Sequence, residues 1–412
     1  MKILFINTID NVGGAALVGW NLGRQLRKRG HDVKYIVGFK KSTDPEVYQL
    51  RKNLLTDYLT KKTGIDFNFM SRGVITKFFA NDIDFGAEEE ILKHPWYKSA
   101  DIVHCNNLHG NFMKFETIIR ISREKKMVWT LHDEWPIMPS GAYADTVLKD
   151  GFYERTCLDT YPAMFWNNDQ YLGKKKRKIY KKSNFDVVVI SRWLKERVEN
   201  SILSDKKVHL IYNGIDTNMF VRHDKINIRK ELNLSRDKKI ILFVADGGSN
   251  PRKGWKYVEK VIEHFRDDAL VSFIGIGGGN DKYEPDFKKV RFIGYQNSVQ
   301  LAKYYSAADL LIFPSMVETF GLIPLEAASV GTPSVAFSVG VIPEFIEHKK
   351  NGYIVKYKDA NDLINGVEYM LNLSDSKLSD ISLELTDKIR KSFNLDTMTN
   401  EYLKLYNHLL KK

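Results

Sequence analysis

The chain contains little cysteine and no long apolar segment. Only Cys105 and Cys157 occur among its 412 residues, which is too few for a disulfide framework or a thiolate metal site. No run approaches the roughly 18 apolar residues that a membrane-spanning helix needs. The apolar start at residues 1–7 is too short for a secretory signal and ends in polar Asn7, so it predicts a buried strand. We therefore expect a soluble protein in the reducing cytoplasm.

Motifs for metal and cofactor binding are also missing. No carboxylate pair of the DxD type stands at a predicted strand end, and neither an HxxxH nor a CxxC spacing occurs. The pair Gly13–Gly14 lacks the spacing of the GxGxxG dinucleotide fingerprint. The sequence therefore predicts neither a metal site nor a resident cofactor.

Positive charge is in clear surplus. The 63 Lys and Arg residues exceed the 51 Asp and Glu residues, which gives a formal net charge of +12. A surplus of this size attracts polyanions, and these include nucleic acid, anionic lipid headgroups and phosphorylated substrates. Charge alone does not distinguish among these three kinds of partner.

Length and hydrophobic periodicity predict two domains of the α/β class. A chain of 412 residues exceeds what one hydrophobic core normally organises. In the first half, short β-branched runs that enter polar loops alternate with helical patterns, as in a parallel sheet. A helix is predicted at Ala15–Lys28. The predicted strands lie at residues 3–6, 33–37, 100–104, 126–131 and 185–190.

The same alternation returns after Asn213–Gly214. Its strands are predicted at residues 239–244, 270–274, 290–293, 310–313 and 333–336, and its helices include 255–265 and 298–306. We therefore expect two Rossmann-like doubly wound domains that face each other across a cleft, with residues 1–213 in the first and 214–394 in the second. The amphipathic tail at residues 395–412 is predicted to form a helix that packs back on the first domain.

Two regions interrupt this alternation, at residues 51–93 and 136–182. Insertions of this size in an α/β domain usually form functional loops. The second region contains the aromatic stretch Tyr161–Trp166, followed by the basic clusters Lys174–Lys178 and Lys181–Lys182. Aromatic side chains beside lysines suit an anionic membrane surface, whereas a solvated helix face would have the same composition. Both interpretations stay open at this point.

The clearest candidate for chemistry is the segment Pro314–Glu326, which contains two glutamates eight residues apart. Pro324 suits a first helical turn, so a short helix is predicted to begin near Leu322. The N–H groups at its start would favour a diphosphate. Glu318 would precede the helix and Glu326 would lie about one turn inside it, one near a sugar and the other near vicinal hydroxyls such as those of a ribose. Two glutamates at this spacing also occur as ordinary surface residues.

Several short motifs together resemble the retaining GT-B glycosyltransferases of family four. In the second half the motifs are Tyr305–Asp309, Phe313–Ser315, Glu318–Gly321, Pro324–Glu326 and Gly331–Pro333. The resemblance covers nearly the whole chain, because further matching motifs are Gly13–Ala15, Asn213–Asp216, Pro251–Gly254, Val341–Glu344 and Asn351–Gly352. It implies a GT-B fold and a metal-independent transfer of sugar from a nucleoside diphosphate, with the donor in the second domain and the acceptor in the first.

The resemblance also implies roles for individual residues. His132 and Glu318 would be catalytic. The acceptor would contact Asn107, His109 and Asp133. Relatives often have an arginine shortly before the phosphate-binding lysine, and Ala245–Asn250 contains none, so Lys253 and backbone amides would carry more of the diphosphate charge. The donor would be bound by Gly13, Gly14, Arg252, Lys253, Thr319, Phe320, Gly321, Leu322 and Glu326.

These residues also have ordinary structural interpretations. Arg252 and Lys253 would serve equally as a solvated charge pair. A lone histidine such as His132 is more often a structural hydrogen-bonding group than a catalytic one. His109 would serve as a loop scaffold, and Gly13–Gly14 as a plain turn between strand and helix.

We expect a retaining glycosyltransferase of the hexosyltransferase type, acting on a glycan or lipid-linked acceptor in surface polysaccharide or glycoconjugate synthesis. A sugar-nucleotide epimerase or a phosphorylase on the same fold is an alternative, and neither needs a separate acceptor. A nucleic-acid-binding protein is a third hypothesis, but the chain has no helix-turn-helix or aromatic-plus-basic RNA motif. The expected location is the cytoplasm, with peripheral attachment to the inner face of the membrane as an open possibility.

Overall fold

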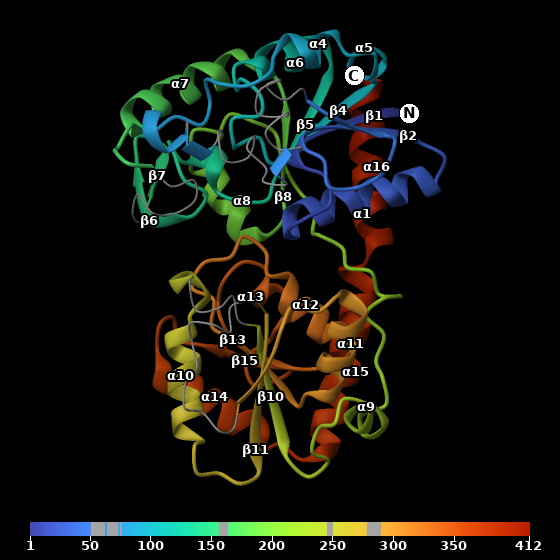
Figure 1. Cartoon of the computed structure of the whole chain (residues 1–412), viewed down its shortest axis with the longest axis vertical. Coiled ribbons are helices and arrows are strands. Elements are labelled where there is room, and N and C mark those ends of the chain that lie inside the picture. The colour runs from blue at the N-terminus through green and yellow to red at the C-terminus, as the bar shows by residue number, and fades with distance from the viewer. Residues whose placement is uncertain (51–61, 64–72, 75, 156–163, 245–249, 278–289) are drawn as a thin grey trace. The chain divides into compact units, whose positions relative to one another are not determined.

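The fold is described from a computed structural model, which describes residues 1–50, 62–63, 73–74, 76–155, 164–244, 250–277 and 290–412. Packing divides the chain into unit 1, with Met1–Tyr212 and Met398–Lys412, and unit 2, with Asn213–Thr397 (Figure 1). Some predictions fall outside the described residues, namely those on Cys157, on Tyr161–Ala163, on Ala245–Ser249 and on most of residues 51–75.

Unit 1 alternates strands and helices along the chain. Helix α16 (Leu395–Lys411) crosses from unit 2 into unit 1 near the end of the sequence. The other described elements of unit 1 are, in chain order, β1 (Lys2–Ile9), α1 (Gly14–Lys28), β2 (Asp32–Phe39), β3 (Val47–Gln49), α4 (Glu89–Lys93), α5 (Pro95–Ser99), β4 (Ile102–Cys105), α6 (Thr117–Glu124), β5 (Lys126–Leu131), η1 (Trp135–Ile137), β6 (Ala144–Lys149), β7 (Phe152–Arg155), α7 (Asp169–Lys182), β8 (Asp186–Val189), α8 (Arg192–Glu199) and β9 (Val208–Leu210).

Seven of the described strands of unit 1 form a parallel sheet, in the order β3-β2-β1-β4-β5-β8-β9. Central β1 pairs with β2 and β4, and its residues Ile3–Ile6 are almost fully buried. A strand covered on both faces needs such a continuous apolar run. The strand order reverses between β1 and β4, and α/β folds bind ligands outside the carboxyl ends of strands at such a point.

A chain of buried polar groups ties α16 to this sheet. His104 in β4 is fully buried, with its Nδ1 2.5 Å from the Tyr406 hydroxyl and its Nε2 2.7 Å from Thr130 Oγ1. Thr130 lies 2.9 Å from the Tyr402 hydroxyl. Burial lowers the pKa of His104 to about 3, so the ring is neutral and each polar atom relies on its protein partner. Hydrogen bonds as well as apolar packing therefore fix α16 to unit 1.

Unit 2 repeats the alternation with a second parallel sheet. Its described strands form a sheet of six in the order β12-β11-β10-β13-β14-β15. The order again reverses at the centre, between β10 and β13. The described elements are α9 (Lys225–Glu231), β10 (Lys239–Val244), η2 (Pro251–Lys253), α10 (Trp255–His264), β11 (Val271–Ile276), β12 (Val290–Ile293), α11 (Ser298–Ala307), β13 (Leu310–Phe313), α12 (Leu322–Ser329), β14 (Ser334–Phe337), α13 (Ile342–Phe345), β15 (Tyr353–Val355), α14 (Ala360–Leu371) and α15 (Asp375–Ser392).

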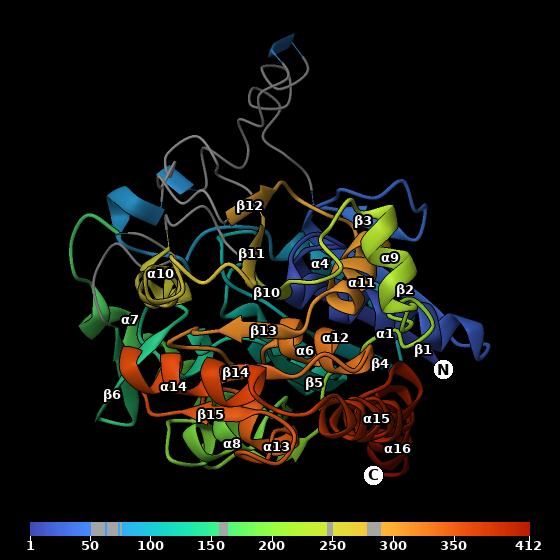
Figure 2. The ribbon, with the colours of Figure 1, turned by 90° about the horizontal axis from the view of Figure 1, so that it is seen from below.

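Helices cover both faces of the second sheet. Figure 2 shows α10 and α14 together on one face and α11, α12 and α15 on the other. Their outer faces are polar: in α10, Tyr257 and Val261 are buried whereas Lys256 and Lys260 are exposed. Among the described helices of both units, none is long and apolar enough to cross a lipid bilayer.

The two sheets confirm the predicted fold class of Rossmann-like parallel sheets. Strands β5, β10, β12 and β13 have the predicted bounds, and α16 begins at the predicted Leu395. The sequence analysis misses the antiparallel pair β6–β7 inside residues 136–182. Short antiparallel strands alternate polar and apolar side chains and lack the continuous apolar run of a buried parallel strand, so their signal is weaker.

Replacing Tyr406 by Phe is expected to destabilise unit 1 by about 1–3 kcal/mol, because His104 would lose a partner where water cannot replace it. The measurement is urea unfolding followed by tryptophan fluorescence, since six of the seven tryptophans belong to unit 1. The control is Tyr369→Phe in unit 2, whose hydroxyl donates to the Lys349 carbonyl near the surface. If both variants unfold at the same urea concentration as the unaltered protein, the hydrogen bond between His104 and Tyr406 contributes nothing to the stability of unit 1.

Candidate active site

The predicted donor residues lie at the carboxyl edge of the sheet in unit 2. Strands β10 and β13 are neighbours there, with β11 and β14 on their outer sides. Loops that leave two such strands toward opposite sides open a crevice that can hold a ligand. Arg252 and Lys253 follow β10, whereas Glu318 and Glu326 follow β13. The fold therefore brings both predicted segments to one edge.

The loop after β13 leads into a helix that begins where the sequence predicts. Helix α12 starts at Leu322, and Gly321 precedes it with φ of +100°, a conformation that favours glycine. Glu318 lies in the loop and Glu326 lies about one turn inside the helix. No described side chain caps this helix start, and the first N–H groups of an uncapped helix attract anions.

Two glycines allow the loops at this edge to touch through their backbones. Gly254 has φ of +75°, and a Cβ placed on it would lie 2.0 Å from the Pro314 carbonyl oxygen. Gly340 has φ of +55°, and a Cβ there would lie 2.4 Å from the Phe320 carbonyl oxygen. Any side chain at either position would push the loops apart. The sequence motifs include Gly254 but miss Gly340.

Hydrogen bonds fix the turn that carries the two cations. Asn250 Oδ1 accepts from the Arg252 backbone N–H at 3.2 Å, which closes the turn before η2. The Met316 N–H donates to the Arg252 carbonyl at 2.8 Å. Arg252 Nη1 also donates to the Val317 carbonyl at 2.6 Å. The loops after β10 and β13 are therefore one connected structure.

Glu318 pairs with both cations. Lys253 Nζ lies 2.7 Å from Glu318 Oε1, and Arg252 Nη1 lies 3.3 Å from the same oxygen. The side chains of Arg252 and Glu318 are each 15% exposed and that of Lys253 is 27% exposed, so water screens their charges less than at an open surface. The two cations share this one carboxylate oxygen, and two neighbouring positive charges favour an anionic ligand at this edge.

Glu326 is held by a phenol rather than by a cation. The Tyr305 hydroxyl donates to Glu326 Oε2 at 3.1 Å. Burial raises the pKa of Glu326 to about 7, and the bond from Tyr305 opposes this rise. Near neutral pH the carboxyl group is thus partly protonated, so it can both donate and accept hydrogen bonds. The sequence motifs contain Tyr305 but assign it no role.

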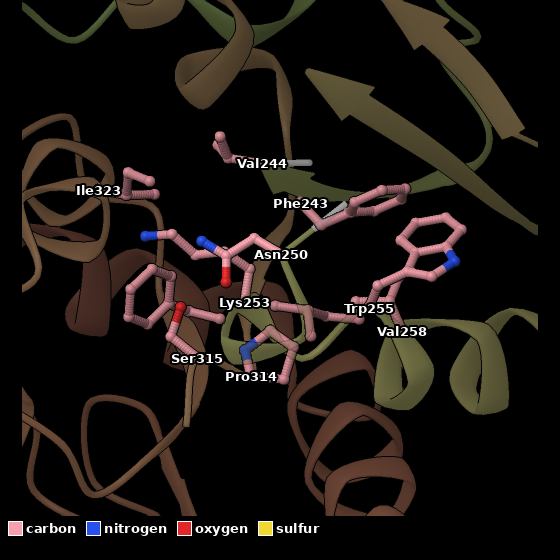
Figure 3. A pocket seen from close by; sticks show the side chains of 11 residues that line it. Phe243, Val244, Asn250, Lys253, Trp255, Val258, Pro314, Ser315 and Ile323 are labelled. Atoms are coloured by element: carbon pink, nitrogen blue, oxygen red, sulfur yellow. The ribbon is translucent and has the colours of Figure 1, made fainter. Parts of the chain in front are cut away.

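A small pocket lies beside Lys253 and is shown in Figure 3. Its volume of about 50 Å³ is too small for a nucleotide, because ligand sites usually measure several hundred Å³. Lys253 lines this pocket together with mostly apolar side chains. The lining residues are Phe243, Val244, Asn250, Lys253, Trp255, Val258, Ile312, Phe313, Pro314, Ser315 and Ile323.

A larger cavity opens at the carboxyl edge of the sheet in unit 1, where the strand order reverses between β1 and β4. Its volume is about 550 Å³, which is in the range of small-molecule sites. The lining includes five predicted residues, namely Gly13, Gly14, Asn107, His109 and Asp133. The other lining residues are Asn7, Thr8, Ile9, Val12, Ala15, Ala16, Phe39, Lys41, Ala142 and Tyr143.

His109 and Asp133 form a polar pair in the wall of this cavity. Nε2 of His109 lies 3.1 Å from Asp133 Oδ2, and both residues are buried. Asp133 Oδ1 accepts from the Trp135 backbone N–H at 3.0 Å. The Thr8 hydroxyl donates to the His109 carbonyl at 2.8 Å. The end of β1 and the loops after β4 and β5 therefore hold one another in position.

His132 lies behind the cavity rather than on its lining. The residue is 8% exposed, and its Nε2 lies 2.9 Å from Asn106 Oδ1. Burial lowers the pKa of His132 to about 4, against the opposing effect of the Asp133 charge, so the ring is neutral at physiological pH. The bond to Asn106 supports the structural interpretation of this histidine, and its catalytic role stays a prediction.

A buried carboxylate supports the loop after His132. Glu134 is fully buried, lies 2.5 Å from Arg197 Nε, and accepts from the Ala144 N–H at 2.9 Å. Burial raises the pKa of Glu134 to about 7, against the charge of Arg197. The sequence does not predict this ion pair, because nothing in the order of the residues shows that Arg197 of α8 contacts the loop.

A buried lysine supports the same loop. Lys176 in α7 is fully buried, and its ammonium group donates to the Trp135 and Met138 carbonyls at 2.7 and 2.9 Å. Burial lowers its pKa to about 7. The sequence analysis places Lys176 in a basic surface cluster with its neighbours, and that prediction is wrong for this residue.

The predicted site residues form two groups, one in each unit. Among the described residues, no group of three or more His, Cys, Asp or Glu side chains is arranged to hold a metal ion. Unit 1 contains Gly13, Gly14, Asn107, His109, His132 and Asp133, and unit 2 contains Arg252, Lys253, Glu318, Thr319, Phe320, Gly321, Leu322 and Glu326.

Comparison with known protein families matches both halves of the chain. Residues 12–219 match the model of Glycosyltransferase Family 4, and residues 224–383 match the model of Glycosyl transferases group 1. Together the two matches cover every predicted site residue of both groups.

Individual proteins resemble the chain over most of its length. A glycosyltransferase of Methanocaldococcus jannaschii is 33% identical over 88% of this chain and 86% of its own length. The N-acetyl-alpha-D-glucosaminyl L-malate synthase of Bacillus anthracis is 24% identical over 98% of this chain and 97% of its own. The solved structure of Anabaena HepE with UDP-glucose superposes with a TM-score of 0.64 at 16% identity, covering 99% of this chain and 100% of HepE.

The Glu326→Gln variant is expected to gain stability relative to the unaltered protein as the pH rises from about 5 to about 8. The folded-state pKa of Glu326 lies above its unfolded value, so the unaltered protein loses stability as this group ionises on the way to a pH of about 7. Glutamine cannot ionise and avoids that loss. Thermal melting at several pH values measures the difference.

The control for this experiment is Glu263→Gln, which alters an exposed carboxylate of α10. Its melting temperature should follow that of the unaltered protein at every pH. An equal pH response of the Glu326 and Glu263 variants would show that Glu326 ionises as freely as a surface group.

Proposed function

This chain belongs to the glycosyltransferases of family 4, and we propose that it is a retaining enzyme that moves a hexose from a nucleoside diphosphate to a glycan or lipid-linked acceptor. The setting we propose is the synthesis of surface polysaccharides or glycoconjugates. The observation that carries the proposal is the pairing of Arg252 and Lys253 with Glu318 at the ligand-binding edge of unit 2.

The two cations are suited to the donor's diphosphate. A diphosphate carries more negative charge than the single carboxylate of Glu318, so it competes effectively for Lys253 and Arg252. The same cations then stabilise the charge that grows on the leaving diphosphate as the sugar departs. Glu318, relieved of part of its pairing, can accept hydrogen bonds from the sugar's hydroxyl groups.

Backbone amides would share the work with these cations. The loop before α12 and the first residue of the helix carry the N–H groups of residues 319–322, and the helix adds the positive end of its dipole. Because Ala245–Asn250 contains no arginine, this contribution is proposed to be larger than in relatives that have one. Thr319, Phe320, Gly321 and Leu322 would thus act mainly through their backbones.

Glu326 is proposed to bind the ribose of the donor. Its carboxyl group has a pKa near 7 and is oriented by Tyr305. A ribose has two adjacent hydroxyls, each able to donate and accept, which matches a partly protonated carboxyl group. This pairing does not distinguish uracil, guanine or adenine.

The reaction that we propose retains the configuration of the sugar. The acceptor oxygen attacks the anomeric carbon from the face that the diphosphate leaves. The bond from that carbon to the leaving oxygen breaks, and the acceptor's proton passes to the leaving diphosphate. We keep the catalytic role of His132 as a proposal, in which its neutral ring, which does not line the cavity, comes to the reacting face as a hydrogen-bonding group when the acceptor binds. The proposed step requires no metal ion.

The acceptor is proposed to occupy the cavity of about 550 Å³ in unit 1. Asn107, His109 and Asp133 would orient an acceptor hydroxyl, since each offers polar atoms at the cavity wall. Gly13 and Gly14 line the same cavity, and no other atom lies within 4 Å of where a Cβ on Gly13 would be, so we propose that the donor can come close to the backbone there. We further propose that the enzyme acts in the cytoplasm, at the inner face of the membrane when its acceptor is lipid-linked.

Lysine 253 is the residue whose loss should matter most. Lys253→Ala is expected to lower kcat by about 10²–10³-fold with a nucleotide sugar, because the leaving diphosphate loses a charge partner. A thermal-shift screen with UDP, GDP, ADP and their sugar conjugates identifies the donor first, with UDP-glucose as the first compound because HepE was solved with it. Product analysis by NMR gives the anomeric configuration.

Two comparisons make this experiment decisive. Lys256→Ala removes an exposed lysine three positions away on α10 and should keep full activity. Unchanged activity after combining Lys253→Ala with Glu326→Ala would overturn the site assignment. Turnover of the donor without any acceptor, to an epimer or a sugar phosphate, would replace the transferase by an epimerase or a phosphorylase.

A further inference from the structure

Unit 1 exposes a group of large aromatic side chains that no role described above uses. They are exposed to between 36% and 65%. Exposed apolar groups scattered singly are common, but a contiguous patch usually marks a surface that binds something. The members of this aromatic patch are Phe78, Phe79, Phe85, Phe165, Trp166 and Tyr171.

Two distant segments of the chain build the aromatic patch together. The rings of Phe78 and Phe165 lie 5.2 Å apart, edge to face. The Trp166 indole N–H donates to the Phe78 carbonyl at 2.8 Å, and the rings of Phe79 and Phe85 lie 5.7 Å apart. These contacts hold the rings in fixed positions while their outer surfaces face water.

Lysines continue the patch along the outer face of α7. Tyr171 occupies this face, and Lys174, Lys178, Lys181 and Lys182 follow it at helical spacing, all of them exposed. The acid of α7, Asp169, is engaged by the Ser140 hydroxyl. Asp84 pairs with Lys175 and also accepts a hydrogen bond from the Tyr171 hydroxyl. Its negative charge is therefore already balanced and does not offset the exposed lysines.

The segment at residues 76–82, which carries Phe78 and Phe79 of the patch, is hydrogen-bonded to the two loops that contain His109 and Asp133. Asn111, two residues after His109, donates through Nδ2 to Thr76 Oγ1 at 2.7 Å and to the Asn81 carbonyl at 2.9 Å. The Trp135 indole N–H, two residues after Asp133, donates to Asp82 Oδ2 at 2.5 Å. A molecule held at the patch would therefore lie beside the loops of His109 and Asp133 within the same unit.

We propose that the aromatic patch and the basic face of α7 dock unit 1 on an anionic phospholipid surface. Aromatic rings enter the zone between headgroups and acyl chains, and each lysine near the surface adds electrostatic attraction to anionic lipid. One membrane-binding feature alone gives only marginal binding to a bilayer. An apolar patch and a basic surface together give stable attachment.

A membrane fits this surface better than a single-stranded nucleic acid. Proteins that bind single strands place aromatic rings along a basic groove, where successive bases stack on their flat faces. The Phe78 and Phe165 rings pack edge to face on each other, and neither cavity described above is lined by patch residues. Along α7 the exposed lysines follow Tyr171 and do not alternate with exposed aromatic side chains.

Vesicle co-sedimentation tests the proposal with the intact protein. The protein should pellet with vesicles of phosphatidylcholine mixed with phosphatidylglycerol at low salt, and should stay in solution with vesicles of phosphatidylcholine alone. The Lys174→Gln, Lys178→Gln, Lys181→Gln triple variant should bind anionic vesicles about a hundredfold more weakly. The Phe78→Ser, Phe165→Ser double variant should weaken binding at least tenfold.

Matched controls alter equally exposed side chains of unit 2. Leu383→Ser removes a side chain that is 61% exposed, and the triple change of Lys230, Lys260 and Lys377 to Gln removes the same charge. Both controls should pellet like the unaltered protein, and the melting temperature of every variant checks its folding.

Three outcomes would overturn the proposal. The first is equal recovery in solution with both kinds of vesicle, and the second is unchanged pelleting of both patch variants. The third is binding of a single-stranded oligonucleotide that the patch variants lose while their vesicle binding persists. The donor screen tests unit 2 separately, so a failure of the membrane proposal leaves the transferase proposal standing, and the reverse holds as well.

Discussion

The candidate donor site depends on three loops that cross at backbone contact distance. At Gly254 and at Gly340, the nearest carbonyl oxygen occupies the space of a β-carbon. The contact at Gly254 brings η2 against the loop after β13, and through it Arg252 and Lys253 reach Glu318. The contact at Gly340 supports the same loop from its other side, just before α12 begins. The two cations, Glu318 and the start of α12 are close together only because the glycines allow these backbone contacts.

The two candidate sites hold charge differently. In unit 2, Arg252 and Lys253 pair with Glu318 and stay partly exposed, where an anion can reach them. In unit 1, Glu134 and Lys176 are fully enclosed and have their partners within the protein. Buried groups of this kind stabilise one arrangement of a loop, since any other arrangement leaves a charge without a partner. The loop they fix is the one that carries Asp133.

Sequence patterns predict the parallel strands well because a strand buried on both faces must be a continuous apolar run. They also place the start of α12 correctly, since Gly321 and Pro324 act through local backbone geometry. The contacts of Gly340 and the burial of Lys176 depend on segments that meet only in the folded chain. The sequence neighbours of a lysine are the same whether its side chain faces the solvent or the core. The composition of the cluster therefore assigned Lys176 to the exposed face, although it is buried.

The polar chain from His104 to Tyr402 and Tyr406 has a consequence for synthesis on the ribosome. Residues of β4 and β5 emerge long before α16, and all of unit 2 is made between them. His104 and Tyr406 are 302 residues apart, so at a synthesis rate of about 5–20 residues per second the wait is roughly 15–60 s. During that interval the imidazole of His104 lacks its phenol partner, and α16 does not yet pack against β4 and β5 at the centre of the first sheet. The domain that is translated first is therefore the one that is completed last.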